Sequence, residues 1–552
     1  MKTAFIAALL FLLLILNLSN ILHESFTDEY DNLLGGSVLN KGELLYKDFF
    51  SNHGPVGYYL AAGIELISHK NFFNFRVIYQ EFIWLGEVVL FYLVFKKYGL
   101  KKAFELSIYF AIVAISANFF YGYLLVADNL AGMFLAAGYI LLFYAFFNKN
   151  ILSTISLAII SLVCFLALFT SLTYIFVVLL LYLFLFLNYF SKAENRGSKS
   201  LLKIAVIVIL PYLLGGSYLF FTKSWYDFYF QTVTFNRQYY VYGEAAKAKN
   251  ILELAYLLLV KALIKYKDLL LTFNQFSLQF PFMPTLLLSN TVLWLSLLLR
   301  RYFKLFLFSF LTVIYTNARN EPFSPGILDF HSSAYIFLSL FNGIFVLFNM
   351  VGILRLKVNL LIKILFGCLG GFLIIYSIAY FQFFYSRWWG IMQDKLAGKT
   401  PLYQIHPVSY YSDMLAGKGG YNLIGPYDPE SSFYSQAKSA SRYYYLMPAM
   451  DKVPAIREEL VRDINKNKPK IIVYHTEMHI LGVEPGKDFI HFLRKDYINL
   501  EDLKTYHHLK YQPILKFVAN FDYDIERHFF IRKDNMEQIL KRLNDLKYIK
   551  IL

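Results

Sequence analysis

The chain has 552 residues, of which 57% are hydrophobic and only 16% are charged, and its mean hydropathy is +0.46. A soluble protein carries about 25% charged residues, so the composition excludes an ordinary soluble fold and predicts a mainly α-helical polytopic membrane protein. The net charge of +15 requires no nucleic-acid partner, because Lys and Arg collect in the short cytoplasmic loops of membrane proteins. The two cysteines lie in apolar segments and give neither a disulfide framework nor a metal-ligand spacing.

Eleven apolar segments approach the length needed to cross a hydrocarbon core of about 30 Å. They lie near residues 4–22, 76–95, 103–120, 129–147, 151–168, 171–190, 201–221, 279–299, 305–317, 332–352 and 360–384. The first segment also resembles a signal peptide, but it is long and has no clear small-x-small cleavage site. We therefore expect it to be retained as the first of about eleven transmembrane helices.

Basic residues predict the orientation of these helices. The loops after the even-numbered spans are short and basic, so we expect them to face the cytoplasm; they are 96–102, 148–150, 191–200, 300–304 and 354–357. With eleven spans, the N-terminus is then cytoplasmic and the C-terminus extracytoplasmic. The high content of Lys, Asn, Ile, Phe and Tyr is typical of an AT-rich bacterial genome, which favours the inner (plasma) membrane of a bacterium.

Two segments expected on the outer side contain further helical patterns. Segment 55–69 is apolar but short and contains Glu65, so we interpret it as an interfacial helix. Segment 222–278 includes an amphipathic stretch at 250–266.

The chain becomes polar after residue 385. It shows a charged helical pattern at 454–467, a buried-strand pattern at 468–475, and two strands joined by a polar turn at 511–533. We expect a transmembrane domain over 1–385 and an extracytoplasmic α/β domain over 386–552.

Polar side chains gather at the outer ends of the expected spans. They are Asp28 and Glu29 after the first span, the group Tyr46, Lys47, Asp48 and His53 in the same loop, Asp128 before the fourth span, Arg237 in segment 222–278, and Arg319 and His331 around the last outer loop. Acidic groups at a membrane boundary are costly unless they are paired, hydrated or functional.

Each of these residues also has an ordinary interpretation. The Asp28-Glu29 pair is often only a solvated helix end, and Asp128 could cap the fourth span. His53 and His331 alone would more often be structural, and Arg319 could be a surface charge. The gathering of these groups on one side is what favours a functional site.

The first outer loop resembles that of the GT-C membrane glycosyltransferases. The closest group is the family-39-like branch, which holds the protein O-mannosyltransferases and the bacterial aminoarabinose and galacturonosyl lipid A transferases. The residues that carry the likeness are Asp28-Glu29, Gly42, Tyr46, Lys47, Asp48, Phe49 and His53-Gly54-Pro55. Two weaker matches are Ala127-Asp128-Asn129, and Arg319 with Phe330-His331. The likeness covers about residues 1–385, and the loop at 326–331 departs from the family pattern.

This resemblance implies a GT-C-like fold and a glycosyltransferase. Such enzymes move a sugar from a polyprenyl phosphate, such as undecaprenyl phosphate, to an acceptor hydroxyl in the outer leaflet. The acceptor would be a glycolipid, a glycan or a protein, as in the modification of lipid A or a polysaccharide of the cell envelope. Inverting transfer needs a carboxylate general base on the incoming hydroxyl, while a cation can stabilise the leaving phosphate.

We assign Asp28 as the general base on its position and on the resemblance. Glu29 and Asp128 would orient the acceptor, hold Asp28 or help to bind a divalent ion. The candidates for binding the donor phosphate are Lys47, Arg237, Arg319 and His331. The candidates for contacting the acceptor, the sugar or a metal are Tyr46, Asp48 and His53.

Carboxylates beside histidine are compatible with Mg²⁺, Mn²⁺ or Zn²⁺, and the spacing does not choose among them. The chain has no nucleotide-binding fingerprint, so we expect no nucleotide cofactor. The expected partners are the lipid-linked donor, the acceptor and membrane lipids.

Two other interpretations stay open. A transporter or flippase of a lipid-linked saccharide would favour inverted repeats and polar groups at the membrane midplane, and the sequence has no evident repeat. A GT-C-type glycan polymerase or ligase would keep the fold but move a whole glycan.

Overall fold

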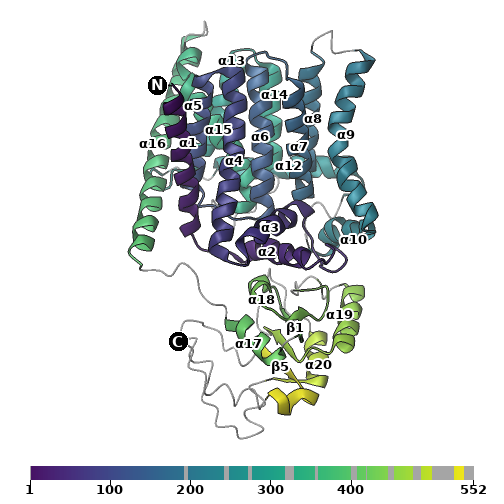
Figure 1. Cartoon of the computed structure of the whole chain (residues 1–552). Helices are drawn as coiled ribbons and strands as arrows, with labels where there is room; N and C mark the ends of the chain where they lie inside the picture. Colours follow the sequence, from purple (N-terminus) through teal and green to yellow (C-terminus); the bar gives the residue numbers. More distant parts are fainter. Residues whose placement is uncertain are drawn as a thin grey trace.

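The computed structural model describes residues 2–191, 197–240, 248–271, 277–317, 329–354, 359–398, 407–417, 419–444, 450, 453–475, 487–499 and 528–539. A bundle of long helices forms one layer, two shorter helices lie across one end of this bundle, and an α/β unit follows beyond them (Figure 1).

Eleven helices of the bundle coincide with the eleven expected spans. They are α1 (Lys2–Ser19), α4 (Phe72–Tyr98), α5 (Leu100–Ser116), α6 (Ala127–Phe147), α7 (Thr154–Thr170), α8 (Ile175–Tyr189), α9 (Ser198–Phe221), α13 (Phe282–Leu299), α14 (Phe303–Thr316), α15 (Ser333–Leu354) and α16 (Leu360–Leu396). Within the described residues, eight of these segments are long and apolar enough to cross a membrane. The others, α5, α7 and α14, have 17, 17 and 14 residues. The polytopic character is therefore confirmed, and the count of eleven spans stays a prediction.

Hydrogen bonds between buried side chains join the helices at the centre of the bundle. The Tyr139 hydroxyl of α6 lies 2.7 Å from Ser309 Oγ and donates to Asn342 Oδ1 over 2.8 Å. Asn342 Nδ2 in turn donates to Asn290 Oδ1 over 2.8 Å. Because lipid is as apolar as the helices themselves, such bonds help to hold membrane helices together where water-driven burial does not.

The two short helices at the end of the bundle are α2 (Thr27–Asn40) and α3 (Pro55–Ser68), and α3 confirms the helix expected at 55–69. Gly35 and Gly36 let α2 and α3 approach closely. A Cβ on Gly35 would lie 2.2 Å from the Tyr58 ring, and one on Gly36 would lie 2.6 Å from the backbone nitrogen of Ala62. The basic loops at 96–102, 148–150 and 300–304, which the structure describes, lie at the opposite end of the bundle, where α4 and α6 end and α14 begins (Figure 1).

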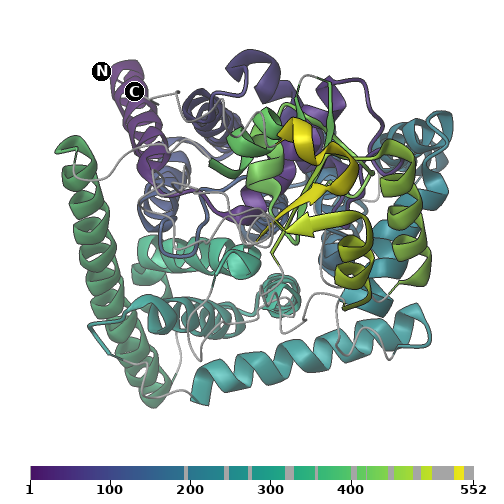
Figure 2. The ribbon, with the colours of Figure 1, turned by 90° about the horizontal axis from the view of Figure 1, so that it is seen from below.

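The expected amphipathic stretch of the second outer segment is also helical. It forms α12 (Ile251–Leu271), which is seen along its length at the lower side of Figure 2, and is preceded by α10 (Trp225–Tyr229) and the π-helix η4 (Phe230–Tyr240). Short 3-10 turns complete the helical elements; they are η1 (Asn20–Leu22), η2 (Leu172–Tyr174), η7 (Phe330–Ser332) and η10 (Lys533–Asn535).

The α/β unit is built on a five-stranded sheet with the order β2-β1-β3-β5-β4. The strands are β1 (Tyr421–Gly425), β2 (Lys438–Ser439), β3 (Ile471–Tyr474), β4 (Tyr497–Asn499) and β5 (Phe529–Arg532), and the helices are α17 (Pro407–Ala416), α18 (Pro429–Tyr434), α19 (Pro454–Asn467) and α20 (Lys487–Asp496). Strand β1 is parallel to β2 and β3, whereas β5 is antiparallel to β3 and β4. The helix expected at 454–467 and the strand expected at 468–475 are confirmed. Strand β5 is the second strand expected at 511–533, and the first lies outside the described residues.

Strand β3 contributes to apolar clusters on both of its faces, because alternate side chains of a strand point to opposite sides. Ile471 and Val473 pack in one cluster inside the α/β unit. Ile472 and Tyr474 belong to a second cluster, here called the shared cluster, which continues into α2 and α3 through residues such as Tyr30 and Tyr58. The α/β unit is therefore joined to the membrane bundle by continuous apolar packing.

The last long helix ends later than the apolar pattern predicts. The expected span stops at residue 384, but α16 continues to Leu396 and is followed by Gly398 with φ +67°. No glycine or proline cluster interrupts the chain between these points, so nothing stops the helix where the apolar run ends. The expected domain boundary at residues 385/386 thus falls inside a helix.

Polar contacts join α18 to α2 and to the turn that follows α3. The hydroxyls of Tyr30 and Tyr434 lie 3.4 Å apart, and Lys70 Nζ donates to the Phe433 carbonyl over 3.1 Å. Glu430 lies at the same junction, and its burial, together with the neighbouring Asp428, raises its pKa to about 7.

We predict that Glu430 makes this junction sensitive to pH. Because the pKa of Glu430 rises from 4.5 to about 7 on folding, the folded state favours the protonated acid, and the resulting stabilisation is lost as the pH rises through about 7. Thermal unfolding of the detergent-solubilised protein should show a loss of up to about 3 kcal/mol between about pH 5 and pH 8. The Glu430→Gln variant should lose less over the same range.

The matched control is Glu458→Gln, which alters an exposed acid of α19 and should leave the pH dependence as in the unaltered chain. Equal pH dependence in the Glu430 variant and the unaltered chain would contradict this role of Glu430.

Candidate functional site

Asp28 and Glu29 lie in the first turn of α2, directly after Phe26 at its N-cap. The partial positive charge of a helix N-terminus favours acidic side chains there, which explains why a new helix begins at this point. The pair is therefore not a solvated end of the first span. Asp28 is half-buried and Glu29 is buried, so the two neighbouring carboxylates occupy different environments.

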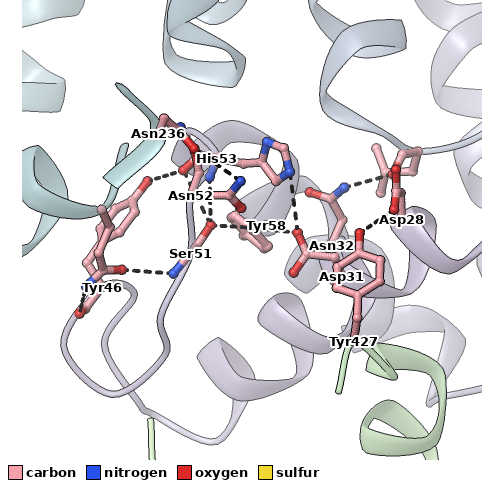
Figure 3. A network of polar contacts seen from close by, with 12 residues as sticks. Asp28, Asp31, Asn32, Tyr46, Ser51, Asn52, His53, Tyr58, Asn236 and Tyr427 are labelled. Atoms are coloured by element: carbon pink, nitrogen blue, oxygen red, sulfur yellow. Dashed lines mark hydrogen bonds and ion pairs between the residues drawn. The ribbon is translucent and has the colours of Figure 1, made fainter. Parts of the chain in front are cut away.

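The Asp28 carboxylate lies between the membrane bundle and the α/β unit. The hydroxyl of Tyr427, from the turn after β1, donates a hydrogen bond to Asp28 Oδ1 (Figure 3). Burial raises the pKa of Asp28 above its ordinary value, and the charge of Asp128 adds to this effect. The Tyr427 hydrogen bond and the imidazoles of His53 and His331 act in the opposite direction. These four groups therefore surround Asp28 closely enough to influence its ionisation.

Asp128 lies in the first turn of α6 and is only 4% exposed. Its Oδ1 accepts a hydrogen bond from the Tyr174 hydroxyl over 3.0 Å. The N-cap of α6 is Val126, with no side-chain cap, so the capping interpretation of Asp128 does not describe its contacts. The structure brings Asp28 and Asp128 together from segments a hundred residues apart in the sequence.

His331 approaches the site from the turn η7, before α15. Its Nδ1 lies 2.9 Å from Asp329 Oδ2, and its backbone N–H donates to Asp329 Oδ1 over 3.0 Å. The imidazole also stacks on the Phe330 ring, with the two centroids 4.2 Å apart. Asp329 and Phe330 thus fix the orientation of the His331 ring.

Asp31 is the carboxylate that the sequence analysis did not assign. It is 3% exposed and accepts a hydrogen bond from the Tyr58 hydroxyl over 2.6 Å. Ser51 Oγ donates to Tyr58 over 2.6 Å, and His53 Nε2 lies 4.0 Å from Asp31 Oδ2 (Figure 3). The spacing from Asp28 to Asp31 is i, i+3, which places both on one side of a helix. The spacing becomes informative only once residues 27–40 are known to form the helix α2.

Glu29 forms a buried ion pair with Arg76. Its Oε2 lies 2.5 Å from Arg76 Nη2 of α4, and both side chains are 0% exposed. The Arg76 guanidinium lies between the rings of Phe72 and Tyr123, 4.9 and 5.1 Å from their centroids. The Leu125 N–H donates to Glu29 Oε1 over 3.4 Å. We therefore assign Glu29 to the architecture of the site. The sequence does contain a signal for Arg76: it is a charged residue at the start of the apolar span expected at 76–95, where an unpaired charge would be costly.

Tyr46 and Asp48, two residues expected to contact the acceptor, the sugar or a metal, instead form hydrogen bonds within the loop between α2 and α3. Tyr46 is fully buried, and its hydroxyl donates to the His53 carbonyl over 2.9 Å. Asp48 is exposed and closes a turn by accepting from the Leu44 N–H over 2.8 Å. These contacts favour structural roles for both residues.

The π-helix η4 supports the same loop from the other side. Gln231 accepts from the Ser51 N–H over 2.8 Å and donates to the Tyr46 carbonyl over 2.6 Å. Asn236 Nδ2 donates to the Asn52 carbonyl over 2.7 Å (Figure 3). The position of His53 is thereby fixed by residues from a segment about 180 positions later in the chain.

The basic residues expected to bind phosphate do not all gather at the site. Arg237 is exposed and donates to the Ala248 carbonyl. Lys47 is half-buried and forms no ion pair with a carboxylate of the described ranges. Arg319 lies outside the described residues. Of this set, His331 is the one that lies close enough to Asp28 to influence its ionisation.

The described part of the chain holds no group of three or more His, Cys, Asp or Glu side chains arranged to bind a metal ion. The divalent cation therefore stays a prediction, and the chemistry considered below uses the side chains alone.

A scan against protein-family models gives no match to the chain, and a search of the curated proteins gives none either.

Breaking the Glu29–Arg76 ion pair should strongly destabilise the protein. Glu29→Gln leaves the Arg76 charge buried without its partner, which costs about 3–5 kcal/mol in such pairs. We expect a lower midpoint of thermal unfolding and a lower yield of monodisperse protein in detergent.

The double variant Glu29→Gln/Arg76→Gln removes both charges and should be less destabilised than the sum of the two single variants, as a double-mutant cycle would measure. Strict additivity of the two single effects would show that the pair contributes nothing beyond its separate side chains.

Proposed function

We propose that the protein is a membrane glycosyltransferase with a GT-C-like architecture. It would move a sugar from a polyprenyl-phosphate donor to the hydroxyl of an envelope glycolipid, glycan or protein. The reaction would take place at the end of the bundle that carries α2 and α3, with Asp28 as the general base. The observation that supports this proposal most is the environment of Asp28, a half-buried carboxylate with a raised pKa beside a second carboxylate and two histidines.

The raised pKa of Asp28 suits a general base. A base takes a proton more effectively when its pKa lies nearer to the working pH, provided that it is still ionised. In the proposed step, Asp28 accepts the proton of the acceptor hydroxyl while the oxygen bonds to the anomeric carbon. The bond from that carbon to the phosphate oxygen breaks, and the phosphate leaves with the electron pair.

The groups around Asp28 supply the other requirements of such a step. Asp128 lies deep at the start of α6 and could orient the acceptor by accepting a hydrogen bond. His53 and His331 are the nearby groups that can carry positive charge, so they suit the leaving phosphate. The orientation of the His331 ring is held by Asp329, whose Oδ2 lies 2.9 Å from Nδ1.

The α/β unit contributes to this site through Tyr427. Its hydrogen bond holds Asp28 Oδ1, so we assign Tyr427 as a positioning residue that also lowers the pKa of Asp28. The proposed site is therefore completed by a segment outside the membrane bundle.

One observation favours the alternative of a lipid-linked saccharide transporter. Glu87 lies midway along α4 and accepts a hydrogen bond from Asn17 Nδ2 of α1 over 2.8 Å, and an ionisable residue within a span often marks a transport path. Pure transport needs a sealed compartment, whereas glycosyl transfer does not. Transfer of sugar in detergent solution therefore separates the two functions.

We predict that Asp28→Asn abolishes transfer while the protein stays folded. Loss of a general base lowers turnover by about 10²–10⁴-fold. The measurement is mass spectrometry of envelope glycolipids in cells that carry the unaltered or variant protein, followed by transfer between purified donor and acceptor in detergent. Asp128→Asn should lower turnover less severely.

Glu24→Gln is the matched control, because Glu24 is an exposed carboxylate four residues before Asp28. Near-normal turnover in both aspartate variants would show that the proposed catalytic assignment is wrong.

Tyr427→Phe should change the pH profile of transfer. Removing the hydroxyl removes a contact that lowers the pKa of Asp28, so this pKa rises. Because the base must be ionised, activity is lost as the pH falls through its pKa, and the loss should begin at a higher pH in the variant. A profile of kcat/KM against pH measures this shift. Tyr410→Phe, at an exposed tyrosine of α17, should leave the profile unchanged, and an unshifted profile in Tyr427→Phe would refute the positioning role.

A further inference from the structure

The ends of α6 and α8 and the start of α14 lie at the end of the bundle opposite to α2, which carries Asp28 (Figure 1). A cavity lies among these helix ends. Its volume is about 470 Å³. Three cationic side chains line it, Lys149, Arg301 and Lys304, and no acidic side chain of the described residues does so. The cavity therefore has a positive character.

The three cations are not neutralised by described carboxylates. All three are exposed, and the contact found for Lys149 Nζ is with the face of the Tyr302 ring, 5.9 Å from its centroid. By contrast, Lys102 at the same end of the bundle lies 2.8 Å from Glu105 Oε2. The charge of the cavity is thus available to an anionic ligand.

One wall of the cavity is held in place by a buried amide. Asn188, near the end of α8, is 5% exposed and donates from Nδ2 to the Asn150 carbonyl over 3.1 Å. Its Oδ1 accepts from the Leu152 N–H over 3.2 Å. These bonds fix the loop between α6 and α7 against α8, so the position of Lys149 is built into the fold.

The start of α14 adds hydrogen-bond donors to the opposite wall. Its N-cap, Tyr302, offers no side-chain bond to the amides of the first turn, and Lys304 and Leu305 of that turn line the cavity. The N–H groups and the dipole of a helix N-terminus favour a phosphate or another anion. The helix end and the three cations therefore favour the same ligand charge.

Apolar side chains continue from the cavity along the outside of the bundle. Leu183 and Leu187 of α8 are 50% and 45% exposed, and Phe303 and Leu307 of α14 are 57% and 48% exposed. Each pair is spaced by four residues and so shares one side of its helix, and α8 packs against α14. A soluble phosphate would need no such surface, whereas the acyl chains of a lipid would.

We infer that this cavity binds the phosphate group of an anionic membrane lipid. The headgroup lies among Lys149, Arg301, Lys304 and the first turn of α14, and the acyl chains lie along α8 and α14. Basic cavities between helix ends on the cytoplasmic side suit such headgroups. This site is separate from Asp28 and does not depend on the proposed glycosyl transfer.

The test is lipid binding to the purified full chain in detergent, measured by native mass spectrometry. The probes are a short-chain phosphatidylglycerol, a short-chain phosphatidylcholine and inorganic pyrophosphate. Each Lys or Arg near an anionic headgroup contributes about fivefold in affinity. The variant Lys149→Gln/Arg301→Gln/Lys304→Gln should therefore bind phosphatidylglycerol about a hundredfold more weakly, with unaltered binding of phosphatidylcholine.

The matched control, Lys96→Gln/Lys101→Gln/Lys363→Gln, removes the same charge from the same end of the bundle outside the cavity and should keep its affinity. The charge-conserving variant Lys149→Arg/Arg301→Lys/Lys304→Arg should also bind and shows that the cavity still forms. Equal loss in the control, or equal affinity for the two lipids, would overturn the inference. Pyrophosphate binding as tight as that of phosphatidylglycerol would overturn the lipid as the source of the phosphate.

Discussion

The buried ion pair between Glu29 and Arg76 is the contact on which the end of the bundle that carries α2 and α3 depends. It anchors the first turn of α2 to the first turns of α4, and Asp28 precedes Glu29 by a single residue. The Arg76 guanidinium also rests on Tyr123, and the Leu125 N–H binds Glu29, so the same pair holds the segment that leads to Asp128. The buried Arg76 charge, neutralised by Glu29, therefore helps to position both Asp28 and Asp128, which are a hundred residues apart in the sequence.

The other constraint on the site comes from outside the membrane bundle. The shared cluster joins the sheet to α2 and α3, and this packing presents Tyr427 to Asp28. The first outer loop is fixed by η4, and His331 is fixed by Asp329. Four separate segments thus meet around one carboxylate. Such an arrangement gives a well-defined electrostatic environment although most of its members lie in connecting segments.

The sequence predicts the parts of this structure that depend on local patterns. Apolar runs coincide with the eleven bundle helices, and short-range periodicity indicates α3, α19 and β3. The basic loops follow the even-numbered spans, whereas Asp28 and Asp128 follow odd-numbered spans, so the sequence places both aspartates at the end of the bundle opposite to the basic loops. What the sequence does not predict depends on packing between distant segments. The helix α2 is rich in glycine and polar residues, so its formation, and the role of Asp31 within it, follow from contact with α3. The contact of Tyr427 with Asp28 and the ion pair of Arg76 with Glu29 likewise depend on tertiary packing between distant segments.

The shared cluster also has a consequence for the order of assembly. The α/β unit follows the bundle in the chain and so leaves the ribosome after it, and part of its apolar packing is completed by Tyr30, Tyr58 and their neighbours from α2 and α3. Those neighbours come into position only after α2 and α3 have settled on inserted helices. Folding of the α/β unit is thereby coupled to correct insertion of the bundle. If the early helices fail to insert, the apolar face of the α/β unit that would pack against α2 and α3 stays exposed. Proteases that degrade misfolded membrane proteins can then recognise this apolar face before the site around Asp28 is assembled.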